Sequence, residues 1–151
     1  QQIFAAVLLD QLYRAATRRR DTAAFIVVEE AHNFASTSPH SVSRPYVAKI
    51  AREGRKFGLG LCLITQRPTK LDQDVASQAM TQIFKRIINP TDLKYVSAVA
   101  EHLEDVKILK TLDETEAVVT GLAAPLPLFI TVESRWTSHG GVTPRLRKEV
   151  I

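Results

Sequence analysis

The sequence predicts an α/β fold in which helices flank a mostly parallel sheet that ends in an antiparallel pair of strands. Two short apolar runs, residues 24–29 and 59–65, each end in polar side chains. This pattern is typical of buried parallel strands whose carboxyl ends face a ligand. Segments with helical spacing of apolar residues lie before the first run and between the two runs. The expected order of elements is α-β-α-β-α-β-α-α-β-β.

The composition is that of one soluble globular domain. The chain has 151 residues, of which 45% are hydrophobic and 24% charged, and it contains no apolar run long enough to span a membrane. The single cysteine, Cys62, lies in an apolar run, which fits a core thiol in a cytoplasmic protein. The net charge of +4 permits nucleic-acid binding without requiring it. Because the chain begins with Gln1 and its one methionine is Met80, we expect a piece of a longer protein.

The first half of the chain predicts two helices and two strands. A stripe of apolar side chains predicts a helix over residues 1–20, and its members are Ile3, Phe4, Val7, Leu8 and Leu12. Residues 24–29 are expected to form a strand that is buried on both faces. A polar loop over 35–45 precedes a helix over 45–57, which proline can begin and glycine can end. Residues 59–65 form the second strand.

The second half of the chain predicts shorter elements separated by proline, asparagine and glycine. The expected ranges are helices over 72–78, 91–100 and 103–110 and strands over 82–88, 115–120 and 126–133. Residues 1–136 then form the folded part. Residues 137–151 form an extended basic tail that is a candidate contact segment.

Acidic and amide side chains follow the two predicted parallel strands. Glu29 and Glu30 come directly after the first strand, and Gln66 follows the second. One carboxylate could hold Mg²⁺ through its water shell, and the other could activate a water molecule. A glutamine there can contact a γ-phosphate or orient that water. The same residues also fit an ordinary strand end with solvated acids, and Glu29-x-x-His32 has the spacing of a di-iron ligand pair.

Basic residues end the helix between the two strands. Arg52, Arg55 and Lys56 lie close together there. An arginine supplied across a subunit boundary could offset charge on a phosphate in the transition state. A solvated basic face explains the same spacing, which does not choose between the two readings. No G-x-x-x-x-G-K-[ST] phosphate-binding loop occurs in the sequence.

Three blocks of the chain together resemble the C-terminal part of the HerA ATPases, in the HerA–FtsK group of hexameric, RecA-like DNA pumps. Residues 26–34 are Ile-Val-Val-Glu-Glu-Ala-His-Asn-Phe, residues 50–58 are Ile-Ala-Arg-Glu-Gly-Arg-Lys-Phe-Gly, and residues 63–68 are Leu-Ile-Thr-Gln-Arg-Pro. The similarity continues through residues 88–92. It implies a RecA-like, P-loop NTPase fold that is incomplete here, because the P-loop strand is absent from this sequence.

The resemblance implies a role for each candidate residue. Glu29 would be the Walker B acid beside Mg²⁺, and Glu30 would be the catalytic glutamate that polarises water. Gln66 would be the sensor on the neighbouring strand. Arg55 would be an arginine finger that reaches the nucleotide of the next subunit, and Arg52 is a second candidate for that role. ATP and Mg²⁺ are the implied cofactors.

The resemblance also implies what the whole protein does. It would hydrolyse ATP and move along double-stranded DNA as a homo-hexamer. A NurA-type nuclease would be its partner in DNA-end resection and recombinational repair, and no membrane partner is expected. The chain alone is expected to be inactive and to expose a sheet edge and apolar surface. The alternatives are a conjugation or type IV secretion ATPase, a non-catalytic oligomerisation or DNA-binding module, and a lone metal-dependent hydrolase.

Overall fold

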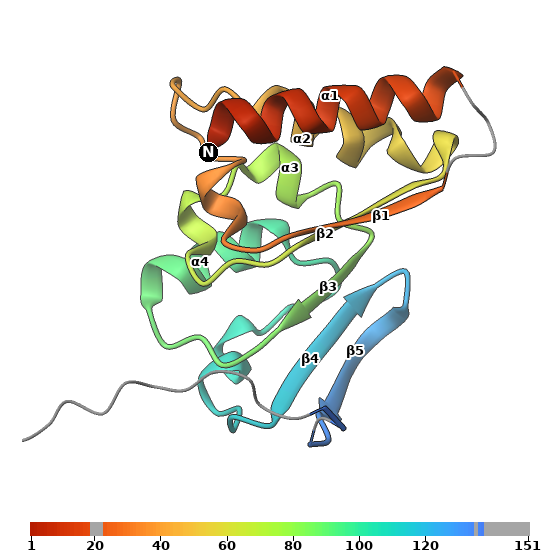
Figure 1. The fold of residues 1–151 in the computed structure, drawn as a ribbon. Coiled ribbons are helices and arrows are strands. Elements are labelled where there is room, and N and C mark those ends of the chain that lie inside the picture. The colour runs from red at the N-terminus through yellow and green to blue at the C-terminus, as the bar shows by residue number, and fades with distance from the viewer. Residues whose placement is uncertain (19–22, 135, 138–151) are drawn as a thin grey trace, which may run out of the picture.

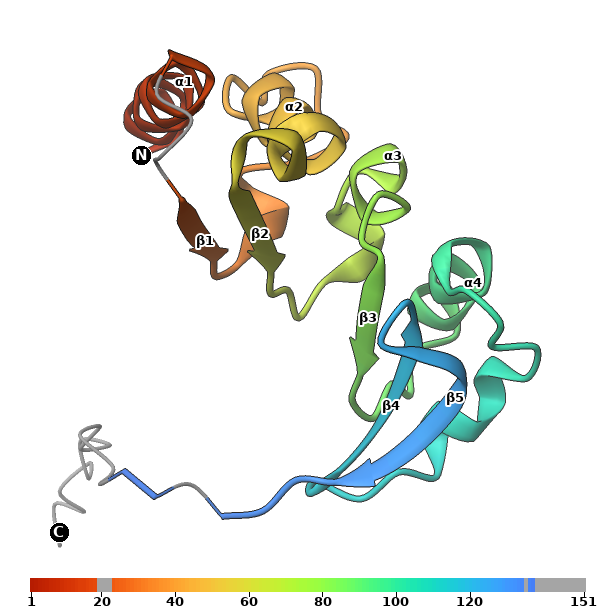
Figure 2. The same ribbon diagram turned by 90° about the vertical axis from the view of Figure 1, so that its right-hand side faces the viewer.

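The helices lie on one side of the strands and leave the other side of the strands uncovered (Figures 1 and 2). The computed structural model describes residues 1–18, 23–134 and 136–137. Its main elements are α1 (Gln2–Arg18), β1 (Ala24–Val28), α2 (Arg44–Glu53), β2 (Leu59–Leu63), α3 (Gln73–Ala76), β3 (Thr81–Phe84), α4 (Pro90–Val99), β4 (Glu116–Gly121) and β5 (Ala124–Thr131). Short 3-10 helices connect them at Ala31–Asn33, Gly54–Phe57, Pro68–Lys70 and Val106–Lys110.

The strands form one parallel pair and one antiparallel sheet. β1 and β2 run parallel, with Ala24 opposite Leu59 and Val28 opposite Leu63. β3, β4 and β5 form an antiparallel sheet in that order. The α/β prediction is confirmed, but the antiparallel part is one strand larger than expected. β3 bonds to β4 because the chain returns beside it, and no ladder joins β2 to β3 within the described residues.

Two buried clusters hold the layers together. The first lies between the helices and β1–β2 and is centred on Val47, Ile50 and Val75. The second lies between α4 and the antiparallel sheet and contains Val96 and Val118. Tyr95 of α4 packs against both clusters. The two parts of the described chain are therefore joined by apolar contacts as well as by the backbone.

β1 buries only one of its faces. Ala24, Ile26 and Val28 pack against the first core cluster, whereas Phe25 and Val27 are 71% and 54% exposed. The prediction of burial on both faces is wrong for the described chain, because all of its helices lie on the same side (Figure 2). The expected exposure of apolar surface is therefore present on this strand.

Some predicted elements differ in length or type. Residues 103–110 contain a 3-10 helix, Val106–Lys110, rather than an α-helix. The third strand ends at Phe84, four residues early, because Phe84 is the last residue with a partner on β4. The first helix is described as far as Arg18. Residues 138–151 of the predicted tail lie outside the described residues, as do Arg19, Arg20 and the basic residues of that tail.

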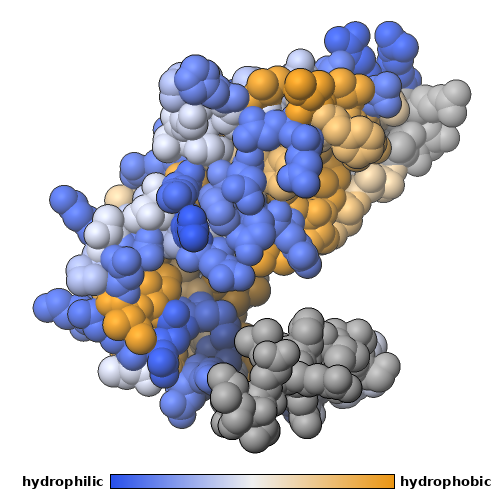
Figure 3. Space-filling view, turned by 60° about the vertical axis from the view of Figure 1, so that its left-hand side comes forward, coloured by the Kyte–Doolittle hydropathy of each residue, from blue (hydrophilic) through white to orange (hydrophobic). Residues whose placement is uncertain are grey.

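The outer face of α1 is apolar. The buried residues of α1 are Ala6, Leu9 and Ala16. The exposed apolar stripe on its outer face comprises Ile3, Phe4, Val7 and Leu8. Apolar surface is visible in the upper part of the molecule, where α1 lies (Figure 3). Within the described part of the chain, neither α1 nor any other helix combines the length and the hydropathy that a membrane span needs.

Candidate active site

The loops that follow β1 and β2 meet at one edge of the parallel pair. Parallel pairing brings the carboxyl ends of both strands to the same edge. The Ile64 amide donates to the Val28 carbonyl at 2.9 Å, and the Ala31 amide donates to the Ile64 carbonyl at 2.9 Å. The Asp72 amide donates to the Ala35 carbonyl at 2.8 Å. These backbone bonds fix the two candidate segments relative to each other.

Glu30 is held in a rare backbone conformation. Its φ and ψ are 48° and 45°, in the left-handed region, immediately before the 3-10 helix Ala31–Asn33. Only His102 shares a positive φ among the other described residues that are not glycine. A non-glycine residue there is strained, and such strain is concentrated at functional sites. The turn directs the Glu30 side chain toward the loop after β2.

The Glu30 carboxylate contacts both Gln66 and His32. Gln66 Nε2 donates to Glu30 Oε1 at 3.1 Å, and His32 Nδ1 lies 3.3 Å from Glu30 Oε2. The structure thus brings together Glu30 and Gln66, which follow the two predicted parallel strands. The Glu30 side chain is 46% exposed, so solvent or a ligand can still reach it. A carboxylate that is oriented yet accessible suits a general base.

His32 and Thr65 are parts of the site whose contribution the sequence did not reveal. His32 Nδ1 lies 3.0 Å from Thr65 Oγ1, and its side chain is only 10% exposed. The imidazole therefore lies between the two loops and contacts a side chain of each. Their position in the sequence could have indicated a role in the site, since both residues fall inside the blocks that carry the family resemblance.

Glu29 lies on the uncovered side of the strand. Residues along β1 alternate between the two faces, and Glu29 is exposed like Phe25 and Val27 before it. No group of three or more His, Cys, Asp or Glu that could hold a metal ion occurs in the part of the chain that the structure describes.

Arg52 and Arg55 are not part of this group. α2 runs back from the loop after Glu30 toward the start of β2 (Figure 1). Arg52 ends α2 and Arg55 lies in the 3-10 helix that leads into β2, so both arginines are toward the opposite end of the strands. Both are exposed. Arg55 Nη1 lies 3.7 Å from Met80 Sδ. Neither arginine can therefore serve the Glu30 site of the same chain without a rearrangement.

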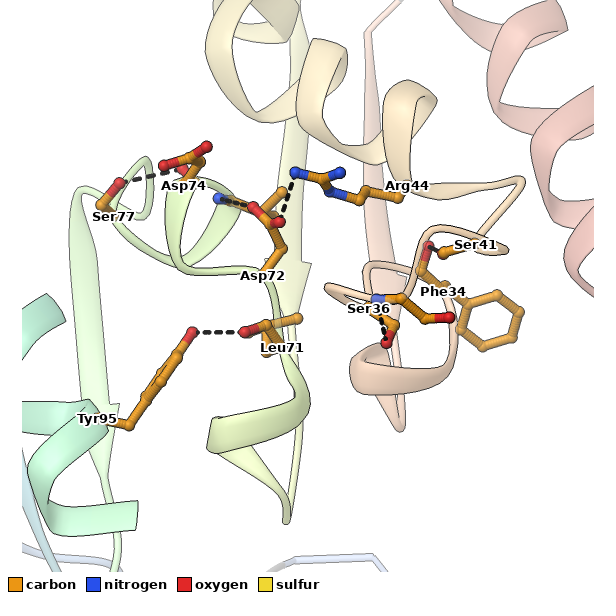
Figure 4. Close-up of polar contacts among 11 residues, drawn as sticks. Phe34, Ser36, Ser41, Arg44, Leu71, Asp72, Asp74, Ser77 and Tyr95 are labelled. Carbon is orange, nitrogen blue, oxygen red and sulfur yellow. Dashed lines mark hydrogen bonds and ion pairs between the residues drawn. The ribbon is translucent and has the colours of Figure 1, made fainter. Parts of the chain in front are cut away.

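Asp72 fixes the far end of the loop that begins at Gln66 (Figure 4). Its side chain is 6% exposed and lies 2.7 Å from Arg44 Nη2. It also accepts the Val75 amide at 3.1 Å as the cap of α3. Tyr95 donates to the Leu71 carbonyl at 3.0 Å. Burial, and secondarily the negative charge of Asp72, raise the pKa of Tyr95 to about 12.

Comparison with protein families identifies the chain. The model of the family described as zonular occludens toxin (Zot) matches residues 7–115, which include both strands and both loops of the site. The chain belongs to this Zot family. The match covers most of the described residues, so the family assignment concerns the same segment as the geometry above.

Curated relatives confirm the resemblance to HerA. A probable DNA double-strand break repair helicase HerA of Methanocaldococcus jannaschii is 39% identical over 136 residues, 89% of this chain and 26% of the relative. The DNA double-strand break repair helicase HerA of Sulfolobus acidocaldarius is 38% identical over 125 residues, 82% of this chain and 25% of the relative. A probable helicase of M. jannaschii is 38% identical over 143 residues, 92% of this chain and 28% of the relative. The chain thus spans about a quarter of the length of these relatives.

Solved structures confirm the P-loop NTPase fold. The genome packaging NTPase B204 of Sulfolobus turreted icosahedral virus 2, in complex with AMPPCP, has a TM-score of 0.70 with 20% identity. The match covers 86% of this chain and 63% of that chain. The DNA-packaging ATPase B204 of Sulfolobus turreted icosahedral virus has a TM-score of 0.69 with 21% identity, over 85% of this chain and 62% of that chain. At this identity the comparison establishes the fold.

Proposed function

We propose that the chain is the C-terminal part of the ATPase domain of a HerA-type DNA translocase. The observation that carries the proposal is the convergence of Glu30 and Gln66 at the carboxyl ends of two parallel strands, with a 3.1 Å hydrogen bond between them. This edge is the usual ligand site of an open α/β sheet. The HerA relatives match the segment that contains both residues.

In this proposal Glu30 is the general base of ATP hydrolysis. Its carboxylate accepts the proton of the attacking water, and the amide of Gln66 and the imidazole of His32 hold that carboxylate in place. Glu29 would hold Mg²⁺ through water, and the ion would neutralise charge on the ATP phosphates. General-base catalysis of this kind contributes about 10²–10⁴-fold.

Arg55 would act on the nucleotide of a neighbouring subunit, with Arg52 as a second candidate. Support comes from two observations: both arginines lie toward the end of the strands opposite Glu30, and both are exposed and so open to contact from another subunit. A homo-hexameric ring would supply such a neighbour. The whole protein would then move along double-stranded DNA in the cytoplasm and work with a NurA-type nuclease in DNA-end resection and recombinational repair.

The chain by itself is proposed to be inactive. The backbone amides of a P-loop provide most contacts to nucleotide phosphates, and the sequence contains no such loop. Purified alone, the chain is therefore expected to show no ATP hydrolysis above background. Hydrolysis that Glu30→Gln abolishes in the chain alone would contradict this part of the proposal.

Mixed rings of the full-length protein test the shared site. Rings of Glu30→Gln subunits and rings of Arg55→Ala subunits should each lose activity. In mixed rings, some interfaces combine the intact Glu30 of one subunit with the intact Arg55 of its neighbour, so activity should partly return. Lys56→Ala, next to Arg55, is the matched control and should leave pure rings active. No recovery on mixing, with rings intact by sedimentation, would contradict the role of Arg55 across the boundary.

A further inference from the structure

A basic cavity lies beside the candidate active site. Its volume is about 260 Å³. It opens between the loop after β1 and the segment that leads from β2 to α3. Its lining includes Arg67, Lys70, His32, His40, Ser36 and Ser38. His32 is shared with the Glu30 site, whereas Glu30 and Gln66 are not among the lining residues.

The ionisable residues of the cavity lining are all bases. Two are permanently charged, Arg67 and Lys70, and no carboxylate lines the cavity among the described residues. The ion pairs found in the described structure involve Arg14, Arg44 and one lining base, His32, which lies 3.3 Å from the Glu30 carboxylate. Neither Arg67 nor Lys70 takes part in an ion pair with a described residue. Uncompensated cations beside hydroxyl groups favour a bound anion.

The walls of the cavity are fixed by hydrogen bonds. Gln2 Nε2 donates to the Asn33 carbonyl at 2.6 Å, and Gln2 Oε1 accepts the Val42 amide at 3.3 Å. Ser41 Oγ donates to the Phe34 carbonyl at 3.2 Å (Figure 4). These bonds hold the loop after β1 against the start of α1. A ligand would therefore lose little binding free energy to the ordering of this loop.

We propose that this cavity binds a phosphate group. Its volume lies below the roughly 300–1,000 Å³ of pockets for larger organic ligands, so a compact anion is the better fit. Arg67 can form paired bonds to phosphate oxygens, and Lys70 adds a second fixed charge. The phosphate could belong to a polynucleotide backbone or be free in solution. The site is distinct from the nucleotide acids, because neither Glu29 nor Glu30 lines the cavity, although His32 is shared.

Inorganic phosphate is the first probe, added to the full-length protein with histidine signals followed by NMR. Phosphate should shift the signals of His32 and His40 in a saturable way and leave His102 unchanged. The double variant Arg67→Ala/Lys70→Ala should bind phosphate at least about tenfold more weakly, since each charge-assisted bond has about that effect. Absence of saturable shifts, or equal binding by the double variant, would overturn the proposal.

Two control variants distinguish phosphate binding in the cavity from general charge attraction and from binding at the nucleotide acids. Lys94→Ala/Lys107→Ala removes the same charge from exposed positions outside the cavity and should leave phosphate binding unchanged. Glu30→Gln should leave it unchanged as well, although it is expected to stop ATP hydrolysis. Loss of the phosphate-dependent shifts in Glu30→Gln would mean that phosphate binds at the nucleotide acids, and the proposal would fail.

Duplex DNA distinguishes the two sources of phosphate. If the cavity holds a backbone phosphate, Arg67→Ala/Lys70→Ala should reduce the slope of log affinity against log salt by about 1, because each neutralised phosphate contributes about 0.9. The Lys94→Ala/Lys107→Ala control should keep the original slope. If phosphate binding is lost in the cavity variant while the DNA slope equals that of the control, the cavity serves free phosphate.

Discussion

The left-handed backbone of Glu30 predicts an unusual order of stability among its substitutions. An L residue in this region is less stable by roughly 1–2 kcal/mol than in the right-handed region, and φ at Glu30 is 48°. Glu30→Ala keeps the Cβ atom that causes this strain, whereas Glu30→Gly removes it. Both variants lose the same contacts with Gln66 and His32. The difference between them therefore isolates the backbone term.

The expected difference follows from two opposing terms. Glycine loses more conformational freedom on folding than alanine, which destabilises it by roughly 0.5–1 kcal/mol. Subtracting this from the relieved strain leaves Glu30→Gly more stable than Glu30→Ala by about 1 kcal/mol. Relative to the unchanged chain both shifts are small, because the Glu30 side chain is 46% exposed and exposed pairs contribute about 0–1 kcal/mol.

Urea unfolding of the variants measures this difference. Ala98→Gly, at an exposed position within α4, is the control for ordinary helical backbone. It should destabilise the chain by about 1 kcal/mol, the opposite sign to the glycine effect at position 30. The reasoning would be refuted if Glu30→Gly were less stable than Glu30→Ala by a similar amount. The strain would then be absent, and the backbone of Glu30 would carry no functional implication.

Three further outcomes are expected elsewhere in the chain. Asp72→Ala should destabilise the chain by about 2–4 kcal/mol, because it removes a helix cap and buried charge-assisted bonds. Asp74→Ala, at an exposed neighbouring position, is the control. If the two variants had the same urea midpoint, Asp72 would not hold the loop. The stability from protonated Tyr95 is present below its unfolded pKa of about 10 and is lost as pH rises through its folded pKa of about 12. Tyrosinate absorbance should give a lower pKa for Tyr95 in Asp72→Asn, and an unchanged pKa would contradict the contribution of Asp72. The chain alone should self-associate in sedimentation, less so with Phe25→Ser/Val27→Ser, and a monomer at all concentrations would count against the apolar face.

The sequence predicted the parallel pair and the site edge well, because their signals are local. The apolar runs around Ile26 and Leu61 mark the two strands, and the polar residues after them mark the edge. The observed contact between Glu30 and Gln66 follows directly from parallel pairing. The short helix predicted from residue 72 is also present as α3, and Asp72 caps it, since its side chain accepts the Val75 amide.

Other features depended on contacts that no local pattern encodes. The pairing of β3 with β4 joins residues about 40 positions apart, such as Thr81 and Gly121. The left-handed turn at Glu30 could not be predicted from the sequence, because no glycine occupies that position. His32 lies between the two loops because Thr65 comes close to it only after folding. The exposed face of Phe25 could not be predicted from β1 itself, because it depends on which helices cover the strand.

ATP hydrolysis by full-length protein with Glu30→Gln tests the central claim most directly. The substitution keeps the size of the side chain and removes its basicity. We predict a fall in the rate of at least about 10²-fold, with the ring and its nucleotide affinity preserved. Glu104→Gln, an exposed acid outside the site, should keep the original rate. Hydrolysis by Glu30→Gln within a few-fold of the unchanged protein would contradict the role of Glu30 as general base.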